Sequence, residues 1–134
     1  MTTHEAGSER QRHPVDALAT FLEDKARHIR TIEQHANEVL HEQNDQAGYR
    51  ALLSQKAELL AALPDDAEHY VTALPDAIAR SVQERLNRFA LSASNALRIG
   101  SIFYMSALLY PEDHKQGAKN DLELYADEVR DIRY

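Results

Sequence analysis

The side chains of this chain that could do metal or acid–base chemistry are seven histidines and twenty-two acidic residues. Glu38 and His41 have the spacing Glu-x-x-His, which supplies a carboxylate and an imidazole to dinuclear iron sites in helical bundles. Glu38 lies nine residues after the apolar Ile29, so at about 100° per residue it falls on the opposite, solvent side of the helix. A second Glu-x-x-His is absent, and we therefore expect Glu38 and His41 to be solvated.

A looser group of titratable residues follows one flank of the same predicted helix: Asp24, His28, His35 and Glu42. Two helical turns separate the imidazoles of His28 and His35 by about 10 Å, which is too far for one metal ion to bind both. Histidine changes its charge between pH 5 and 8, so a pH-dependent role at an interface remains an alternative to a solvated flank. The remaining histidines do not group, and the sequence predicts no metal site.

Nucleophilic and phosphate-binding motifs are also absent from the sequence. It contains no cysteine, no Ser-His-Asp order and no glycine-rich loop, and four glycines are too few to build a phosphate cradle. The sequence therefore favours a protein that is not an enzyme and that binds no cofactor.

Length, charge and the first residues limit the class of protein. A chain of 134 residues is the size of one domain, and a net charge of −7 repels nucleic acid and anionic membranes. Residues 1–13 are polar and aperiodic, which predicts a disordered tail without a secretion signal, and hence a cytoplasmic location. The apolar run near residue 100 is shorter than a membrane span and is interrupted by Arg98.

Apolar residues recur at helical spacing throughout the rest of the chain. The pattern predicts helices over residues 14–43, 49–63, 65–110 and 122–132, of which the third is the longest and is kinked or restarted at Pro75. Four amphipathic helices with short connections bury their apolar stripes only against one another. We therefore expect an all-α, antiparallel four-helix bundle over residues 14–134, with two long and two shorter helices.

The third predicted helix is apolar around its whole circumference near residues 96–110. One stripe contains Ile78, Phe89, Ala96 and Phe103. The opposite side is a possible partner-binding seam, formed by Leu91, Asn95, Arg98, Ile102, Met105 and Leu109. Three coverings of this seam are open: the chain's own helices, a second copy, or a helical client. In a buried seam Asn95 and Arg98 need polar partners.

The order of helices and two stretches of sequence resemble FlgN-type flagellar export chaperones. The first stretch runs from Glu38, Leu40 and Asp45 into residues 49–63, YRALLSQKAELLAAL, with Lys56 before Leu59, Leu60 and Leu63. The second is NALRIGS, residues 95–101, within the long third helix. The resemblance implies a helical protein that holds helical terminal segments of subunits before export, without catalysis or cofactor.

The sequence thus predicts a non-enzymatic interaction protein. It would act as a homodimeric scaffold or adaptor, or as a small export-type chaperone that binds a helical partner through its third helix. The alternative is a metal-binding bundle of the ferritin-like type.

Overall fold

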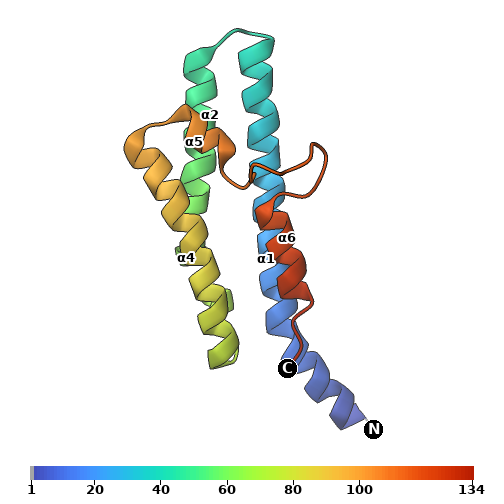
Figure 1. Ribbon diagram of the computed structural model, residues 1–134. Helices are drawn as coiled ribbons and strands as arrows, with labels where there is room; N and C mark the ends of the chain where they lie inside the picture. Colours follow the sequence, from blue (N-terminus) through green and yellow to red (C-terminus); the bar gives the residue numbers. More distant parts are fainter. Residues whose placement is uncertain (1) are drawn as a thin grey trace.

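The computed structural model describes residues 2–134, with side chains described from Arg12 onward. These residues form six α-helices and no strand (Figure 1): α1 (Thr2–His41), α2 (Gln46–Ala61), α3 (Leu63–Val71), α4 (Asp76–Ile99), α5 (Ile102–Ala107) and α6 (Asp121–Arg130). The all-α class is therefore confirmed. No helix within the described part of the chain is both long and apolar enough to cross a membrane.

Helix α1 is the longest element, and not the third predicted helix. Its stripe of Val15, Leu18, Leu22, Ala26, Ile29, Ile32, Ala36 and Val39 is buried, as the three- and four-residue spacing predicts. The predicted disordered tail, residues 1–13, lies almost wholly outside the residues whose side chains are described, and it stays a prediction. Pro14 lies inside α1.

Local signals explain where α2 and α3 begin and end. Asp45 caps α2, because its Oδ1 accepts a hydrogen bond from the amide of Gly48 at 2.9 Å. The helix ends at Ala61, and Pro64 lies in the first turn of α3, where a proline costs no hydrogen bond. α3 ends at Val71 and Pro75 precedes α4, so Pro75 separates two helices and does not kink one.

The prediction of one helix up to Tyr110 is wrong, because α4 ends at Ile99. Gly100 has φ +71°, its amide donates to the carbonyl of Leu97, and the amide of Ser101 donates to that of Ala96. These are the hydrogen bonds of a Schellman motif, which ends helices at a left-handed glycine. Ser101 then caps α5 by accepting a hydrogen bond from the amide of Tyr104 at 3.1 Å.

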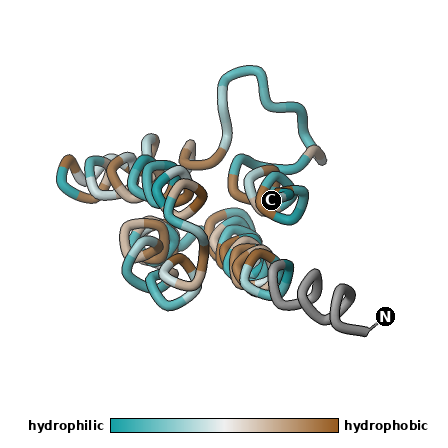
Figure 2. The backbone as a smooth tube through the Cα atoms, turned by 90° about the horizontal axis from the view of Figure 1, so that it is seen from below, coloured by the Kyte–Doolittle hydropathy of each residue, from teal (hydrophilic) through white to brown (hydrophobic). Residues whose placement is uncertain are grey.

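The helices surround the core in pairs (Figures 1 and 2). α2 returns antiparallel along α1, α4 packs on α2 and α3, α5 crosses α2, and α6 packs on α1. Within the described residues, no Cα atom of α4 lies within 8 Å of a Cα atom of α6. The backbones of these two helices therefore stay apart, and they meet only through side chains such as Phe89 of α4 and Tyr125 of α6, whose ring centres are 6.1 Å apart.

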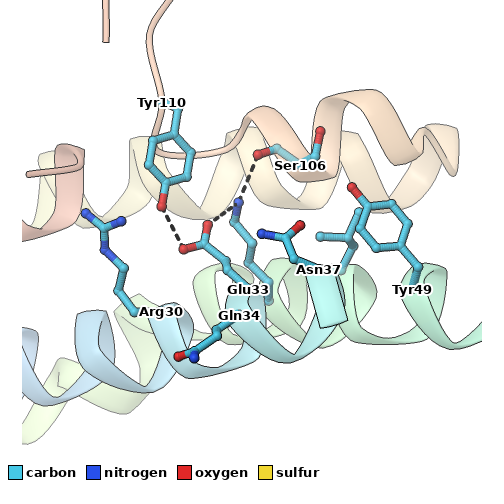
Figure 3. Close-up of a pocket in the computed structure, with 9 residues that line it drawn as sticks. Arg30, Glu33, Gln34, Asn37, Tyr49, Ser106 and Tyr110 are labelled. Carbon is cyan, nitrogen blue, oxygen red and sulfur yellow. Dashed lines mark hydrogen bonds and ion pairs between the residues drawn. The ribbon is translucent and has the colours of Figure 1, made fainter. Parts of the chain in front are cut away.

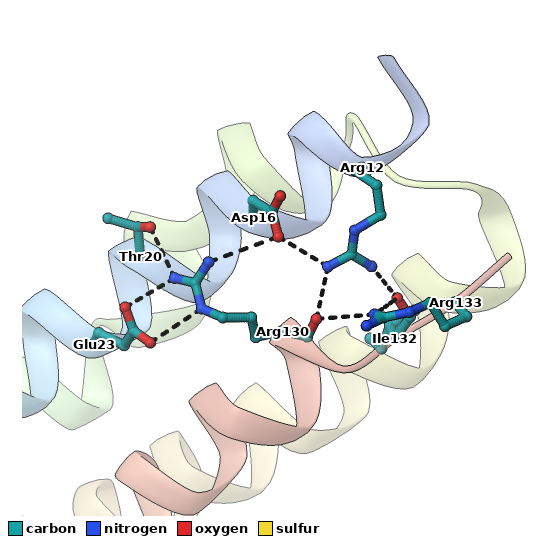
Figure 4. A network of polar contacts seen from close by, with 7 residues as sticks. All are labelled: Arg12, Asp16, Thr20, Glu23, Arg130, Ile132 and Arg133. Carbon is teal, nitrogen blue, oxygen red and sulfur yellow. Dashed lines mark hydrogen bonds and ion pairs between the residues drawn. The ribbon is translucent and has the colours of Figure 1, made fainter. Parts of the chain in front are cut away.

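Charged side chains fasten α6 to α1 at its C-terminal end (Figure 4). The guanidinium of Arg130 binds both carboxylate oxygens of Glu23, at 2.9 and 3.2 Å, and the hydroxyl of Thr20 at 3.0 Å. Arg12 binds Asp16 at 2.9 Å and donates to the carbonyls of Arg130, at 2.7 Å, and Ile132. α6 thus belongs to the α1 side of the fold.

The N-terminal end of α6 is ordered by its own residues and by a second link to α1. Asn120 and Glu123 form a reciprocal capping box at the first turn. Arg30 of α1 binds the Glu123 carboxylate at 2.7 Å. Both ends of α6 are therefore tied to α1.

Candidate functional site

The six residues of the predicted seam do not share one helix face, because the chain turns at Gly100. On α4, Leu91 has 62% of its surface exposed, and Asn95 and Arg98 are exposed as well. Met105 and Leu109 are buried in the protein's own core, and Ile102 is half-buried against it. Whether a partner binds Leu91, Asn95 and Arg98 stays a prediction.

The apolar stripe assigned to the predicted third helix changes sides at the same turn. Phe89 is half-buried and Ala96 is buried, but Phe103 is 73% exposed. The stripe prediction is wrong for Phe103, because α5 takes a new direction after Gly100 and turns Met105 toward α2.

The titratable residues at the end of α1 lie as the sequence predicts. Glu38 and His41 are exposed, as are Asp24, His28 and His35. Among the described residues, no three histidines, aspartates or glutamates come close enough to hold a metal ion.

Among the described side chains, the most deeply buried charge is Lys56 of α2, which has no surface exposed to solvent. Its neighbours Glu33, Ser106 and Tyr110 are shown in Figure 3. Its ammonium binds Glu33 Oε2 at 2.9 Å and the carbonyl of Ser106 at 3.1 Å, and lies 5.1 Å from the centre of the Tyr110 ring. The Tyr110 hydroxyl donates to Glu33 Oε1 at 2.6 Å. These contacts join α1, α2 and the segment around α5.

Burial changes the acid–base behaviour of this cluster. Desolvation lowers the pKa of Lys56, although the nearby Glu33 carboxylate opposes the change. Desolvation and the hydrogen bond to Glu33 raise the pKa of Tyr110 to about 12. Each charged group already has an opposite charge or a hydrogen-bond partner within the protein, so the cluster is best explained as a tie that holds α5 against the α1–α2 pair.

No sequence pattern predicts this cluster as a whole, although one signal for the burial of Lys56 is present. Lys56 lies three residues after Leu53 and four before Leu60, both buried, which puts its side chain on the apolar stripe of α2. Glu33 and Tyr110, by contrast, are 77 residues apart and carry no sequence signal of their contact.

A line of hollows follows the side of the molecule where the backbones of α4 and α6 stay apart. Neighbouring hollows share residues, and we call this continuous feature the α4–α6 groove. Its middle hollow has a volume of about 430 Å³. Its lining includes Ile78, Val82, Arg85, Arg88, Phe89, Ser92, Asn95, Ala96 and Ile99 from α4; Tyr104, Leu108 and Leu109; and Asp121, Leu124, Tyr125, Glu128, Val129 and Ile132 from α6 and the chain after it.

The groove is mainly apolar at the hollow that Ile99 and Tyr104 line, and it is mixed polar and apolar at its middle hollow. Leu109 and Leu60 belong to the core beneath it, while Ile99, Tyr104 and Leu124 are each about half exposed. Large apolar side chains exposed side by side are typical of an interaction surface and uncommon elsewhere.

Charged residues on the two walls differ in whether they have partners. Arg85 bridges the groove, because it binds Glu128 at 3.3 Å and lies 4.6 Å from the centre of the Tyr125 ring. Arg88 on the α4 wall and Asp121 on the α6 wall make no side-chain hydrogen bond or ion pair with any other described residue. Partial burial raises the pKa of Asp121, although His114 and Arg85 oppose this change.

Comparison of the chain with protein-family models, with curated proteins and with solved structures finds no match.

Proposed function

We propose that the protein is a non-enzymatic helix-binding protein, an adaptor or export-type chaperone, in which an amphipathic helix of another protein lies along the α4–α6 groove. The observation that carries the proposal is the open side between α4 and α6, where half-exposed Leu124, Ile99 and Tyr104 surround a floor of core residues. An amphipathic helix has an apolar stripe that fits such a groove.

In this proposal α1, α2, α4 and α6 are the four helices of an antiparallel bundle whose fourth side is left open for the partner. The resemblance to FlgN-type chaperones supports the same class of function. The net charge of −7 opposes both a second copy and nucleic acid as the occupant.

A neutral synthetic peptide tests the proposal. It has 18 residues, a stripe of leucine and alanine, and serine and glutamine elsewhere, and its binding is followed by fluorescence anisotropy and by amide NMR shifts of the protein. We expect shifts along α4 and α6, and at least ten-fold weaker binding by Leu124→Glu. The matched control is Leu91→Glu, because Leu91 is similarly exposed but lies outside the groove.

The opposite pattern, in which Leu91→Glu and not Leu124→Glu removes binding, would place the partner on the outer side of α4 and refute the groove. Sedimentation equilibrium of the protein alone is the second test. A stable dimer that Leu124→Glu converts to a monomer would mean that a second copy occupies the groove, which also contradicts the proposal.

A further inference from the structure

Two charges of the middle hollow make no ion pair within the described residues, and their positions bear on the occupant of the α4–α6 groove. Arg88 and Asp121 line the same hollow from opposite walls, with the apolar Leu124 and Phe89 also in its lining. Asp121 is in addition part of the lining of the next hollow, together with Ile99 and Tyr104. An apolar stripe lying in the groove would thus have a cation along one edge and a carboxylate along the other.

The other two charges of the middle hollow are already paired within the protein, because Arg85 binds Glu128 across it. Glu84 of α4 makes no ion pair with any other described residue, but it lines the neighbouring hollow and not the middle one. Arg88 and Asp121 are therefore the lining charges of the middle hollow that a partner can pair without first breaking an ion pair.

We infer that the partner of the groove is an amphipathic helix with an acidic residue on one flank of its apolar stripe, opposite Arg88, and a basic residue on the other flank, opposite Asp121. This inference rests on the proposed helix-binding function. Complementary charges at the edge of an interface contribute mainly to specificity and orientation, while the apolar stripe supplies most of the affinity.

The same arrangement fixes the direction of the bound helix. Reversing a helix in the groove exchanges the walls that its two flanks meet. In one direction the acidic flank of the bound helix faces Arg88 and its basic flank faces Asp121. In the opposite direction each flank faces a side chain of its own charge. A partner with flanks of opposite sign therefore binds in one direction, whereas a partner with neutral flanks has no such preference.

The test compares the neutral peptide with a charged peptide, in which the same apolar stripe has lysines on one flank and glutamates on the other. At low salt we expect the charged peptide to bind about ten-fold more tightly, from two partly exposed ion pairs. The ratio of the two affinities should fall toward one at about 0.5 M salt, because salt screens the ion pairs.

Variants of the protein test whether Arg88 and Asp121 are the charges that pair with the peptide. Arg88→Gln and Asp121→Asn should each reduce the ratio of the affinity for the charged peptide to the affinity for the neutral peptide. Arg80→Gln and Asp131→Asn are matched controls, because these residues are exposed and contribute no side chain to the groove. A nitroxide at the N-terminus of the charged peptide should broaden amide signals at only one end of the groove.

The outcomes distinguish a failure of the charge inference from a failure of the proposed helix-binding function. If both peptides bind with equal affinity at low salt, or if the control variants reduce the affinity ratio as much as Arg88→Gln and Asp121→Asn, the charge inference is wrong and helix binding stands. If neither peptide binds, the proposed function fails and the inference fails with it.

Discussion

The ion pair between Lys56 and Glu33 gives the sharpest test of how this fold is held together. At 2.9 Å and an effective dielectric constant of about 20, their attraction is roughly 6 kcal/mol. Removing two charges from water costs several kcal/mol per ion, so the pair as a whole contributes little net stability. Removing one partner alone destabilises the fold, because it leaves the other charge buried without an opposite charge.

Glu33→Gln removes the opposite charge of a fully buried ammonium, and we expect it to lower the free energy of unfolding by about 3 kcal/mol at pH 7. Lys56→Met should cost less, about 1–2 kcal/mol, because the Glu33 side chain is 16% exposed and keeps its hydrogen bond from Tyr110. The double variant should be more stable than Glu33→Gln alone.

The cost of Glu33→Gln should also depend on pH. Burial lowers the pKa of Lys56 below its ordinary 10.5, so between the two values the unfolded chain binds more protons than the folded one. Stability then rises with pH across this window. In Glu33→Gln the carboxylate that opposes the lowering is gone, the window widens, and the variant should recover stability relative to the natural protein as the pH approaches 10.5.

Urea unfolding followed by circular dichroism measures these differences, and Glu38→Gln is the control, because Glu38 is an exposed glutamate of the same helix. Two results would refute the argument that Lys56 is charged and dependent on Glu33 in the folded protein. One is a decrease in the free energy of unfolding below about 1 kcal/mol for Glu33→Gln, and the other is an equal decrease for Lys56→Met and Glu33→Gln.

Two other features of the fold lead to measurable effects on stability. Gly100→Ala places a side chain at φ +71°, so it should lower the free energy of unfolding by about 1 kcal/mol in urea titrations; an increase would mean that a continuous α4–α5 helix is readily accessible. Burial raises the pKa of Tyr125 from 10.0 to about 12, so between these values the folded protein holds the proton and stability falls as pH rises. Tyr125→Phe should therefore make the free energy of unfolding in urea titrations depend less steeply on pH in this range. An unchanged slope would contradict the raised pKa of Tyr125.

The periodicity of apolar residues was enough to predict which residues are buried in helices that present a single apolar stripe to the core. The buried residues of α1 and of α6, such as Leu22 and Leu122, follow the three- and four-residue spacing. The all-α class could be predicted for the same reason. The break before α2 was predicted from the turn-forming residues 44–48, but the helix already begins at Gln46, because Asp45 caps it.

The end of α4 could not be predicted in this way. A glycine inside a helical pattern costs only about 1 kcal/mol, so apolar spacing on both sides of Gly100 indicates a continuous helix. In the structure Met105 and Leu109 are buried in the core, and Leu109 even adopts φ +76°. Burial of two large apolar side chains outweighs the few hydrogen bonds of a longer helix.

The sequence by itself thus determined which residues are apolar at helical spacing, and hence the helical class, the stripes of the outer helices and the solvated position of Glu38. Only the tertiary structure decided that Lys56 meets Glu33 and Tyr110, and that Arg88 and Asp121 face one hollow. The physical reason is that helical spacing is a local property of the chain. Contacts between residues far apart depend on how the helices pack, which no local pattern specifies.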